Sequence, residues 1–349
     1  MNFKRLWAIF RARNHEFFRD RAAFGWNFVF PFLIVGGFIL MFGGDARNQY
    51  KVGIFPVKSE TFSVAAVDIP ARFKETRYLQ FIGFESEQEA LKKLNHHKID
   101  FLVKAGSAKN EYWVSETSPK GYIVEQLFTK SLVPAHLEPQ AKRRKIMGFE
   151  IRYVDWLFPG ILAMNMMFSA LYGVGYTVVR YRKNGVLKRL KATPLSAVEY
   201  LSAQMLSRIF LLMFTTVIVW TGCDLVFSFR TVGSYFNIFV IFFLGSLSLT
   251  SLGLIIASRG TSEEFSSGIL NFISWPMMFL SEVWFSLEGA PAWIKTVSQV
   301  FPLTHMLTAT RKVMNDGASL TDVSYELSAM MIMTAVCLVI GASLFSWTR

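Results

Sequence analysis

A strongly basic stretch lies in the middle of the chain, at residues 182–196, with the sequence RKNGVLKRLKATPLS. It contains no carboxylate, and its cations are Arg182, Lys183, Lys188, Arg189 and Lys191. Such side chains bind carboxylates of other proteins and anionic lipid headgroups. Gly185 and Pro194 punctuate the stretch, and apolar residues lie between its charges. The pattern indicates a defined contact with another molecule or with the membrane surface.

Motifs that carry catalysis are absent from the sequence. It has no G-x-x-x-x-G-K-[ST] phosphate-binding loop, no G-x-S-x-G nucleophile elbow and no H-E-x-x-H zinc pair. His96 and His97 lie in a hydrophilic stretch, which does not favour a metal role. Cys223 and Cys337 fall in apolar runs and offer neither a disulfide framework nor a metal cluster. We expect this chain to bind no metal or cofactor.

The elements that must position the basic stretch are predicted to be membrane spans. Of 349 residues, 52% are hydrophobic and only 18% are charged, a balance typical of membrane proteins. A helical span needs about 17 to 25 apolar residues. Five runs without Asp, Glu, Lys or Arg fit, and a sixth is interrupted only by Arg208: 24–43, 156–179, 235–258, 265–281 and 327–348, then 200–223. The sequence therefore predicts six spans.

Flanking charges predict the orientation of these spans. Residues 1–23 carry six Lys or Arg and two acids, which favours a cytoplasmic N-terminus. One crossing places 45–155 outside, and the next returns the basic stretch to the cytosol. The cations Lys142–Lys145 lie on the side assigned outside, but long translocated loops largely escape the charge rule. The net charge of +12 is spread along the chain, so a nucleic-acid partner is not expected.

The predicted architecture is an α-helical polytopic membrane protein with an inserted α/β domain. Its parts are an amphipathic cytoplasmic helix in the membrane interface (1–23), the first span (24–44), an extracytoplasmic α/β domain (45–155), and a five-span domain (156–349) with a cytoplasmic loop (180–198) and an outer re-entrant segment (286–316). Phe3, Leu6, Trp7 and Phe10 give the first helix its apolar stripe. The alternative is a soluble helix packed on a partner.

The inserted domain is predicted from β-rich runs and helix caps. Strands are expected at YKVGIF (50–55), SVAAVDI (63–69), LQFIGF (79–84), KIDFLV (98–103) and EYWVS (111–115). Ser86, followed three residues later by Glu89, matches a capping box for a helix in SEQEALKKLN. A second helix is expected at 122–132.

Two longer stretches carry a family resemblance. The sequence FPGILAMNMMFSALYGVGYTVVRYRKNGVLKRLKATPLS (158–196) and the sequence LNFISWPMMFLSEVWFSLEGAPAWIKTVSQVFPLTHMLTATRKVM (270–314) resemble the type-2 membrane permeases of ATP-binding-cassette (ABC) transporters. The match also includes the R-D-R approach to the first span, and it belongs to the branch with a large extracytoplasmic domain between the first two spans. It covers essentially the whole chain in order. A departure occurs at Ser281-Glu282, where Ser-Gly is expected.

The resemblance implies a dimeric efflux permease in the bacterial cytoplasmic (inner) membrane, with both termini in the cytoplasm. Two ABC ATPase subunits would bind ATP and Mg beneath it. Its other implied partners are a second permease subunit (a copy or a paralogue), membrane lipid and, optionally, a periplasmic adaptor. A short helix at 186–190 would insert into the ATPase. Its packing contacts would be Leu187 and Leu190 and its polar contacts Lys188 and Arg189, with Lys183 and Gly185 at its start. Alternatively, these cations only orient the loop and bind headgroups.

The cargo pathway implied by the resemblance runs between the second and fifth spans. Its candidates are Asn165, Phe168, Tyr172, Asn271 and Trp275, since aromatic and amide groups suit amphiphilic cargo. Ordinary helix packing is the alternative for each of them. Arg208 either faces the cavity, where it would attract an anionic head group, or snorkels to the inner interface as an anchor.

These observations predict the transmembrane subunit of an ABC exporter for amphiphilic, lipid-like or drug-like cargo. An alternative is a polytopic membrane enzyme that modifies lipids or glycans through its extracytoplasmic domain, although no cluster of acids, bases or metal ligands supports it. A membrane receptor is a further alternative, but its cytoplasmic segments would be too short for a signalling domain.

Overall fold

The structure, a computed structural model, describes residues 2–42, 50–57, 63–96, 98–106, 111–133, 153–260 and 262–347. The chain divides into two compact units. The helical unit consists of Met1–Phe42 and Phe149–Arg349, and the α/β unit consists of Gly43–Gly148. The cations Lys142–Lys145, which oppose the predicted orientation, lie outside the described residues.

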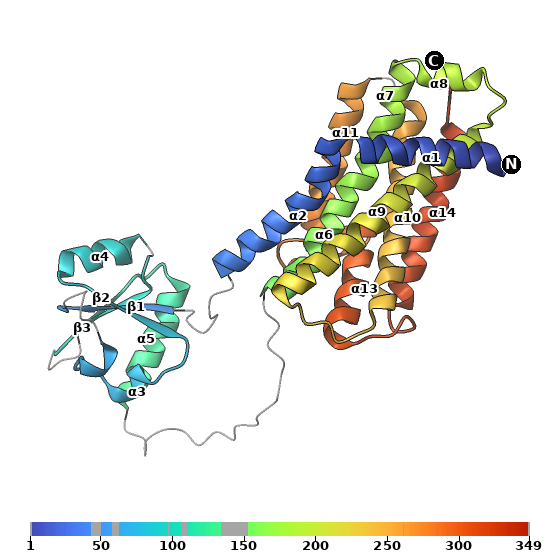
Figure 1. The fold of residues 1–349 in the computed structure, drawn as a ribbon. Coiled ribbons are helices and arrows are strands. Elements are labelled where there is room, and N and C mark those ends of the chain that lie inside the picture. The colour runs from blue at the N-terminus through green and yellow to red at the C-terminus, as the bar shows by residue number, and fades with distance from the viewer. Residues whose placement is uncertain are drawn as a thin grey trace. The chain divides into compact units, whose positions relative to one another are not determined.

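The helical unit is an assembly of long apolar helices joined by short turns (Figure 1). In chain order its elements are α1 (Phe3–Arg19), α2 (Arg21–Phe42), α6 (Tyr153–Leu171), the π-helical turn η4 (Tyr172–Tyr176), α7 (Thr177–Lys183), α8 (Val186–Lys191), α9 (Ala197–Phe227), α10 (Tyr235–Arg259), α11 (Glu263–Leu280), α12 (Ala292–Ser298), α13 (Pro302–Asp316) and α14 (Ser324–Leu344). Figure 1 shows α8 and the C-terminus at one end of this unit, and the loop joining α13 to α14 at the other.

Four helices are long and apolar enough to cross a membrane, namely Tyr153–Lys183, Ala197–Phe227, Tyr235–Ser258 and Ser324–Leu344. A fifth candidate is the bent pair Phe3–Arg19 and Phe24–Leu40, whose axes meet at 61°. The polytopic helical fold is therefore confirmed, whereas the predicted count of six spans is not. The predicted fifth span, 265–281, forms most of α11, but this 18-residue helix begins with two glutamates and contains Asn271 and Pro276, which lower its hydropathy.

Helix α1 packs along α9. Leu6 is buried, Phe10 and Phe210 meet edge to face, and the Ser207 hydroxyl donates to the Asn14 side chain over 2.7 Å. The face of α1 predicted to lie in the lipid interface thus covers part of its own chain. Phe3 remains exposed at the surface of the helix.

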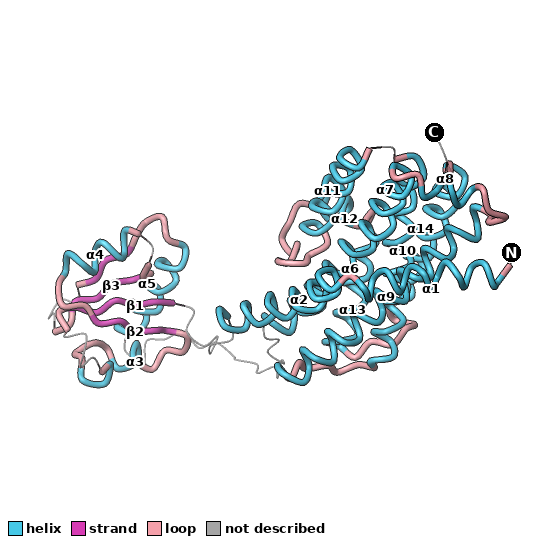
Figure 2. The backbone as a smooth tube through the Cα atoms, turned by 45° about the horizontal axis from the view of Figure 1, so that its top comes forward, coloured by secondary structure: helices cyan, strands magenta, loops and turns pink. Residues whose placement is uncertain are grey.

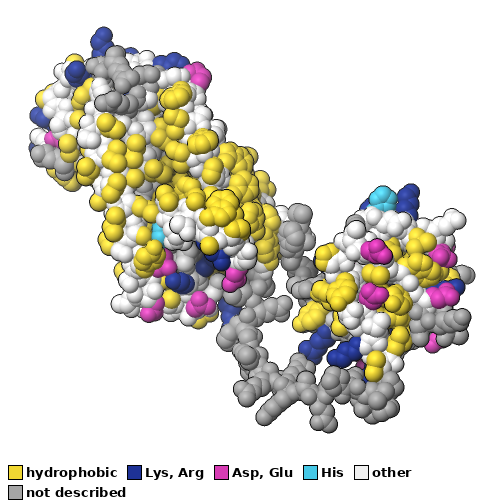
Figure 3. All heavy atoms as spheres, turned by 180° about the vertical axis from the view of Figure 1, so that it is seen from behind, with side chains coloured by type: hydrophobic (Ala, Val, Ile, Leu, Met, Phe, Trp, Pro, Cys, Tyr) yellow, Lys and Arg dark blue, Asp and Glu magenta, His cyan; other side chains and the backbone are white. Residues whose placement is uncertain are grey.

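Helix α10 occupies the centre of the helical unit, where it packs against α6, α9, α13 and α14. Small residues permit this close packing. Ser246, Thr250 and Ser251 are fully buried, and a Cβ added at Gly253 would lie 3.3 Å from the backbone of Leu171. Figure 3 shows hydrophobic side chains over the middle of one face of this unit and charged side chains toward its two ends. This distribution suits a protein embedded in a bilayer.

The α/β unit is a four-stranded sheet with helices on both faces (Figure 2). Its elements are β1 (Tyr50–Phe55), η2 (Val64–Ala66), α3 (Ala71–Lys74), β2 (Leu79–Gly83), α4 (Glu87–Asn95), β3 (Phe101–Lys104), β4 (Tyr112–Val114) and α5 (Pro119–Leu132). The strand order is β2-β1-β3-β4, with β1 parallel to β2 and β3, and β4 antiparallel to β3.

The two faces of this sheet follow from the alternation of its side chains. Phe73 of α3 and Phe128 of α5 pack on the face that carries Val52 and Ile54, whereas Leu94 of α4 packs on the opposite face. The Ser86 hydroxyl accepts from the Glu89 amide at the start of α4. Four of the five predicted strands and both predicted helices are confirmed.

The predicted strand at 63–69 is wrong. Its first part forms the 3-10 turn η2, and Pro70 is the N-cap of α3, which begins at Ala71. Val67 and Ile69 still reach the core, which explains their alternation in the sequence. Alternating apolar residues indicate burial, but they do not supply a neighbouring strand to pair with.

Candidate functional site

The basic stretch forms a short helix between two spans. Helix α7 ends at Lys183, and Gly185 takes a left-handed conformation with φ of 71° before α8 begins at Val186. Glycine adopts this conformation without the steric cost that other residues bear. Downstream, Ser196 and Glu199 form a capping box at the start of α9. The predicted helix at 186–190 is thus present, with Gly185 at its start.

Helix α8 has one face toward its own chain and one toward its surroundings. Leu187 is fully buried among Val178, Tyr200 and Leu201, and Leu190 packs beside this cluster. Leu187 therefore packs within its own chain in this conformation, and its contact with an ATPase subunit stays a prediction. Burial of this leucine anchors α8 to the neighbouring helices. The exposed side chains of α8 are Lys188, Arg189 and Lys191.

Arg182, at the end of α7, binds the end of α10. Its guanidinium donates to the carbonyls of Ala257, Ser258 and Gly260, and also to that of Ser346 near the C-terminus. These contacts satisfy carbonyls that a helix end leaves free. The sequence shows Arg182 only as one of the loop cations and does not reveal this role. Its position one residue before Lys183 gave no signal of which helix end it would meet.

The start of α11 is joined to α7 and to η4. Lys183 Nζ lies 3.4 Å from a carboxylate oxygen of Glu263, and the Tyr176 hydroxyl donates to the other oxygen over 2.7 Å. A second carboxylate, that of Glu264, lies 3.8 Å from Lys183. The element that carries the basic helix is therefore tied directly to α11.

A cavity of about 580 Å³ lies among α2, α6, η4, α9 and α11. Its lining residues are Trp26, Asn27, Phe30, Ile34, Met164, Asn165, Phe168, Ser169, Tyr172, Arg208, Trp275, Met278 and Trp284. Five of the six predicted pathway residues are among them. The sixth, Asn271, is exposed on α11 one turn before Trp275 and does not line the cavity.

A polar network joins the walls of this cavity. Arg208 Nη2 donates to both the carbonyl and the hydroxyl of Ser169. The Ser169 hydroxyl donates to the Asn27 side chain over 3.2 Å, and Asn165 donates to the Asn27 carbonyl over 3.4 Å. Asn27 and Ser169 were not predicted as pathway residues from the sequence. A lone amide in the apolar run 24–43 was the signal that could have pointed to Asn27.

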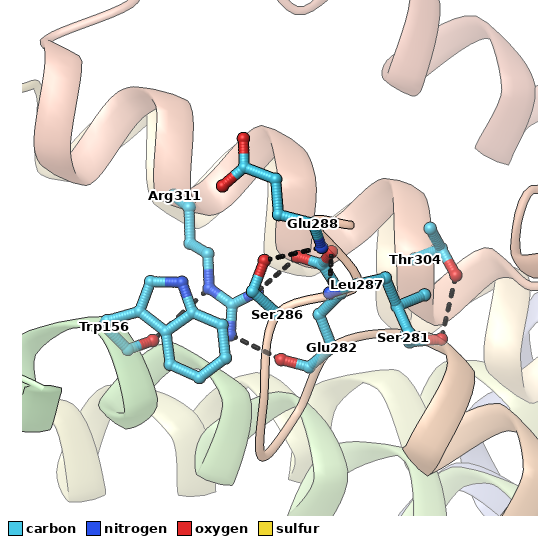
Figure 4. A network of polar contacts seen from close by, with 8 residues as sticks. All are labelled: Trp156, Ser281, Glu282, Ser286, Leu287, Glu288, Thr304 and Arg311. Carbon is cyan, nitrogen blue, oxygen red and sulfur yellow. Dashed lines mark hydrogen bonds and ion pairs between the residues drawn. The ribbon is translucent and has the colours of Figure 1, made fainter. Parts of the chain in front are cut away.

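A second polar hollow, of about 540 Å³, lies between the end of α11 and helices α12 and α13. At its edge Arg311 lies over the Trp156 ring, 3.8 Å from the centroid, and donates to the Glu282 carbonyl over 2.7 Å (Figure 4). A Glu282 carboxylate oxygen lies 3.4 Å from Arg311, and the other accepts from the Leu287 amide over 2.8 Å. Glu282 has φ of 59°, which explains why glycine is expected at this position.

The sequence model of the family described as "ABC-2 family transporter protein" matches residues 22–343. The probable multidrug ABC transporter permease YbhR of Escherichia coli (strain K12) is 21% identical over 360 residues, covering 95% of this chain and 96% of that protein. The probable multidrug ABC transporter permease YbhS of the same strain is 21% identical over 345 residues, covering 91% and 90%. The daunorubicin resistance ABC transporter permease protein DrrB1 of Streptomyces coeruleorubidus is 23% identical over 190 residues, covering 53% and 65%.

Proposed function

The chain belongs to the ABC-2 family of transporter proteins, and from this premise we propose that it is the permease subunit of an ATP-driven exporter. The resemblance seen in the sequence is confirmed, and so is its assignment as a transport subunit rather than an enzyme, because the relatives are named ABC transporter permeases. Its proposed cargo is an amphiphilic, lipid-like or drug-like molecule, taken from the cytoplasm or the inner leaflet. The names of the relatives, which refer to multidrug transport and daunorubicin resistance, support this cargo class.

The proposed contact with the ATPase subunits, where ATP and Mg would bind, is helix α8. The observation that carries this proposal is its arrangement: a short helix fixed by the buried Leu187 that presents Lys188 and Arg189 outward. Movement of such a helix would displace α7, to which it is joined. The ion pair of Lys183 with Glu263 would transmit this displacement to α11, whose Trp275 lines the cavity. Closure of the ATPase subunits could thus change the cavity.

The proposed partner in the membrane is a second permease subunit, either a copy or a paralogue. Aromatic side chains near the cavity are exposed at the surface of this chain, among them Trp26, Phe272 and Trp275. A second subunit that covers them would enclose the cavity for amphiphilic cargo. The sites that we propose for the cargo are those of the five sequence-predicted residues that line this cavity.

The proposed location is the bacterial inner membrane, with both termini in the cytoplasm and the α/β unit outside. The cations of the first 23 residues and those of the basic stretch support this orientation. In the helical unit, α8 and the C-terminus lie at the same end (Figure 1). Extracytoplasmic placement would let the α/β unit meet a periplasmic adaptor.

The test of this proposal is co-purification with the ATPase subunit. The double variant Lys188→Glu/Arg189→Glu should reduce recovery of the ATPase about tenfold or more, because two attractive charges become repulsive. Stimulation of ATP hydrolysis by cargo should be lost with it. The matched control is Lys92→Glu/Lys98→Glu, which reverses two exposed cations of the α/β unit and should leave both readings unchanged.

Membrane insertion and the gel-filtration profile of the double variant must equal those of the unaltered chain, since neither altered side chain is buried. An ATPase that still co-purifies at full stoichiometry with the double variant would contradict the assignment of α8. A chain that exports cargo with no ATPase bound would contradict the proposed function itself.

A further inference from the structure

Arg208 lies where two hollows of the helical unit meet. It lines the cavity described above and also a smaller hollow of about 180 Å³ between α1, α7 and α9. The smaller hollow is polar, with Arg13, Glu16, Arg180 and Gln204 in its lining. An amphiphile with its polar end toward the smaller hollow and its apolar body in the cavity would match this change of character.

Within the described residues no carboxylate lies at ion-pair distance from Arg208, although Glu16 and Asp20 line the smaller hollow with it. Its Nη2 donates to the carbonyl and hydroxyl of Ser169, which are both neutral acceptors. Its Nε is buried and has no hydrogen-bond partner, and none of the carboxylates in the described ranges forms an ion pair with it. A buried polar nitrogen without a partner is uncommon in native structures.

The depth of Arg208 makes this arrangement costly. It is the twelfth residue of the 31-residue helix α9, so it lies roughly 16 Å along the helix at about 1.5 Å per residue. A cation within a span is costly and almost always faces a cavity or a partner. An anionic group bound beside it would restore the missing charge pair.

The rest of the cavity suits an apolar body. Six aromatic side chains contribute to its lining, namely Trp26, Phe30, Phe168, Tyr172, Trp275 and Trp284. Among the described lining residues, Arg208 is the only charged one. The cavity therefore combines a single cation with an extended aromatic surface.

We propose that Arg208 selects the cargo, and that the cavity takes an amphiphile with one anionic head group, which binds the guanidinium, and an apolar body, which packs on the aromatic walls. The inference rests on the proposed function, because it names the cargo class of the same cavity. It excludes the alternative in which Arg208 is an anchor at the membrane interface.

Gly173 keeps the guanidinium in this position. A Cβ added there would overlap Nε and Cζ of Arg208, so the arginine can lie against η4 only because residue 173 has no side chain. Gly173 has no positive φ that would demand glycine for backbone reasons. The position of the charge can therefore be tested separately from its presence.

The test measures binding to the full chain in nanodiscs, through quenching of tryptophan fluorescence by a matched pair of brominated probes. The pair is dibromostearate at about pH 9, where the carboxylate is ionised, and its neutral methyl ester. We expect the unaltered chain to bind the anion about tenfold or more tightly than the ester. Arg208→Gln should bind both probes equally, whereas the control Arg11→Gln, which removes an exposed cation of α1, should retain the preference.

A second variant keeps the charge and moves it. Gly173→Ala should reduce the preference for the anion by several-fold, because its methyl group displaces the guanidinium. Thermal unfolding of each variant shows whether it is folded, and Arg208→Lys, which keeps a cation, should retain part of the preference. Equal binding of both probes to the unaltered chain, or an undiminished preference in Arg208→Gln, would overturn the proposal.

Two sources of the anion can be distinguished with brominated phospholipids in the same nanodiscs. Stronger quenching by phosphatidylglycerol than by phosphatidylcholine, lost in Arg208→Gln, identifies a membrane lipid as the anion. A preference confined to dibromostearate identifies a free amphiphile. Binding requires no ATPase, so loss of ATPase contact in the α8 variants would leave these results unchanged, and the two proposals can fail independently.

Discussion

Two arginines of the helical unit, the partly buried Arg208 and the buried Arg311, have opposite surroundings. Arg311 lies over Trp156, donates to the Glu282 carbonyl and faces the Glu282 carboxylate (Figure 4). Arg208 donates only to Ser169, and its Nε has no partner. One cation is thus matched by an anion and an aromatic face, whereas the other is matched by neither.

The difference separates an arginine that supports the fold from one that we propose binds a ligand. A paired cation that joins α6, the turn after α11 and α13 holds three elements together, and its removal leaves a carboxylate without its partner. An unpaired cation contributes little to the fold and carries a desolvation cost. We expect such a residue to persist because something other than the fold requires it.

The largest predicted effect is therefore on Arg311. Arg311→Met should lower the free energy of unfolding by about 3 kcal/mol, because it leaves the Glu282 carboxylate without a cation and removes the contact with Trp156. Thermal or denaturant unfolding in detergent measures the loss. Lys295→Met, which removes an exposed cation of α12 beside the same hollow, is the control and should change stability by less than about 0.5 kcal/mol. An equal loss in both variants would contradict the pairing.

A smaller effect is expected at Glu282, where two contributions oppose each other. Glu282→Ala should lower the unfolding free energy by about 2 kcal/mol, because it removes the contact with Arg311 and the acceptor for the Leu287 amide. Glu282→Gly removes the same groups but relieves the left-handed backbone by about 1 kcal/mol. The same unfolding assay should therefore rank glycine above alanine. The reverse ranking would show that the backbone conformation carries no cost here.

The backbone contribution can be measured alone at Gly185, which has a left-handed φ of 71° and no atom within 4 Å of an added Cβ. Gly185→Ala should cost about 1 kcal/mol through the backbone alone. The matched control is Gly268→Ala within α11, which also has open space around it and should gain up to about 1 kcal/mol as a helix-interior glycine. A loss at Gly185 and a gain at Gly268 are the expected pair of results.

How far the sequence could predict this structure depends on how local the cause is. The helix at 186–191 was predictable because Gly185 and the Ser196 cap act on adjacent residues. Most strands of the α/β unit were predictable from alternation, but 63–69 was not, since pairing depends on residues far away in the chain. The count of six spans was not confirmed at α11, because the run 265–281 carries no charge but the helix that contains it begins with Glu263 and Glu264.

The candidate site was predictable in its residue types but not in its contacts. Phe168, Tyr172 and Trp275 share helical spacing and do line one cavity. Whether the Leu187 side chain faces inward and the Asn271 side chain faces outward depends on how the neighbouring helices pack. A single sequence does not specify this packing. The same holds for Arg208, whose contacts with Ser169 depend on the packing of α9 against α6.

The smallest change in stability is expected at Arg208. Arg208→Met should change the unfolding free energy by less than about 1 kcal/mol in either direction. It removes hydrogen bonds to Ser169, each worth about 1 kcal/mol, but it also removes the desolvation cost of an unpaired cation. Measured beside Arg311→Met in the same detergent, it should unfold close to the temperature of the unaltered chain. A loss as large as that of Arg311→Met would show that Arg208 is a structural residue, because its charge would then be compensated within the fold.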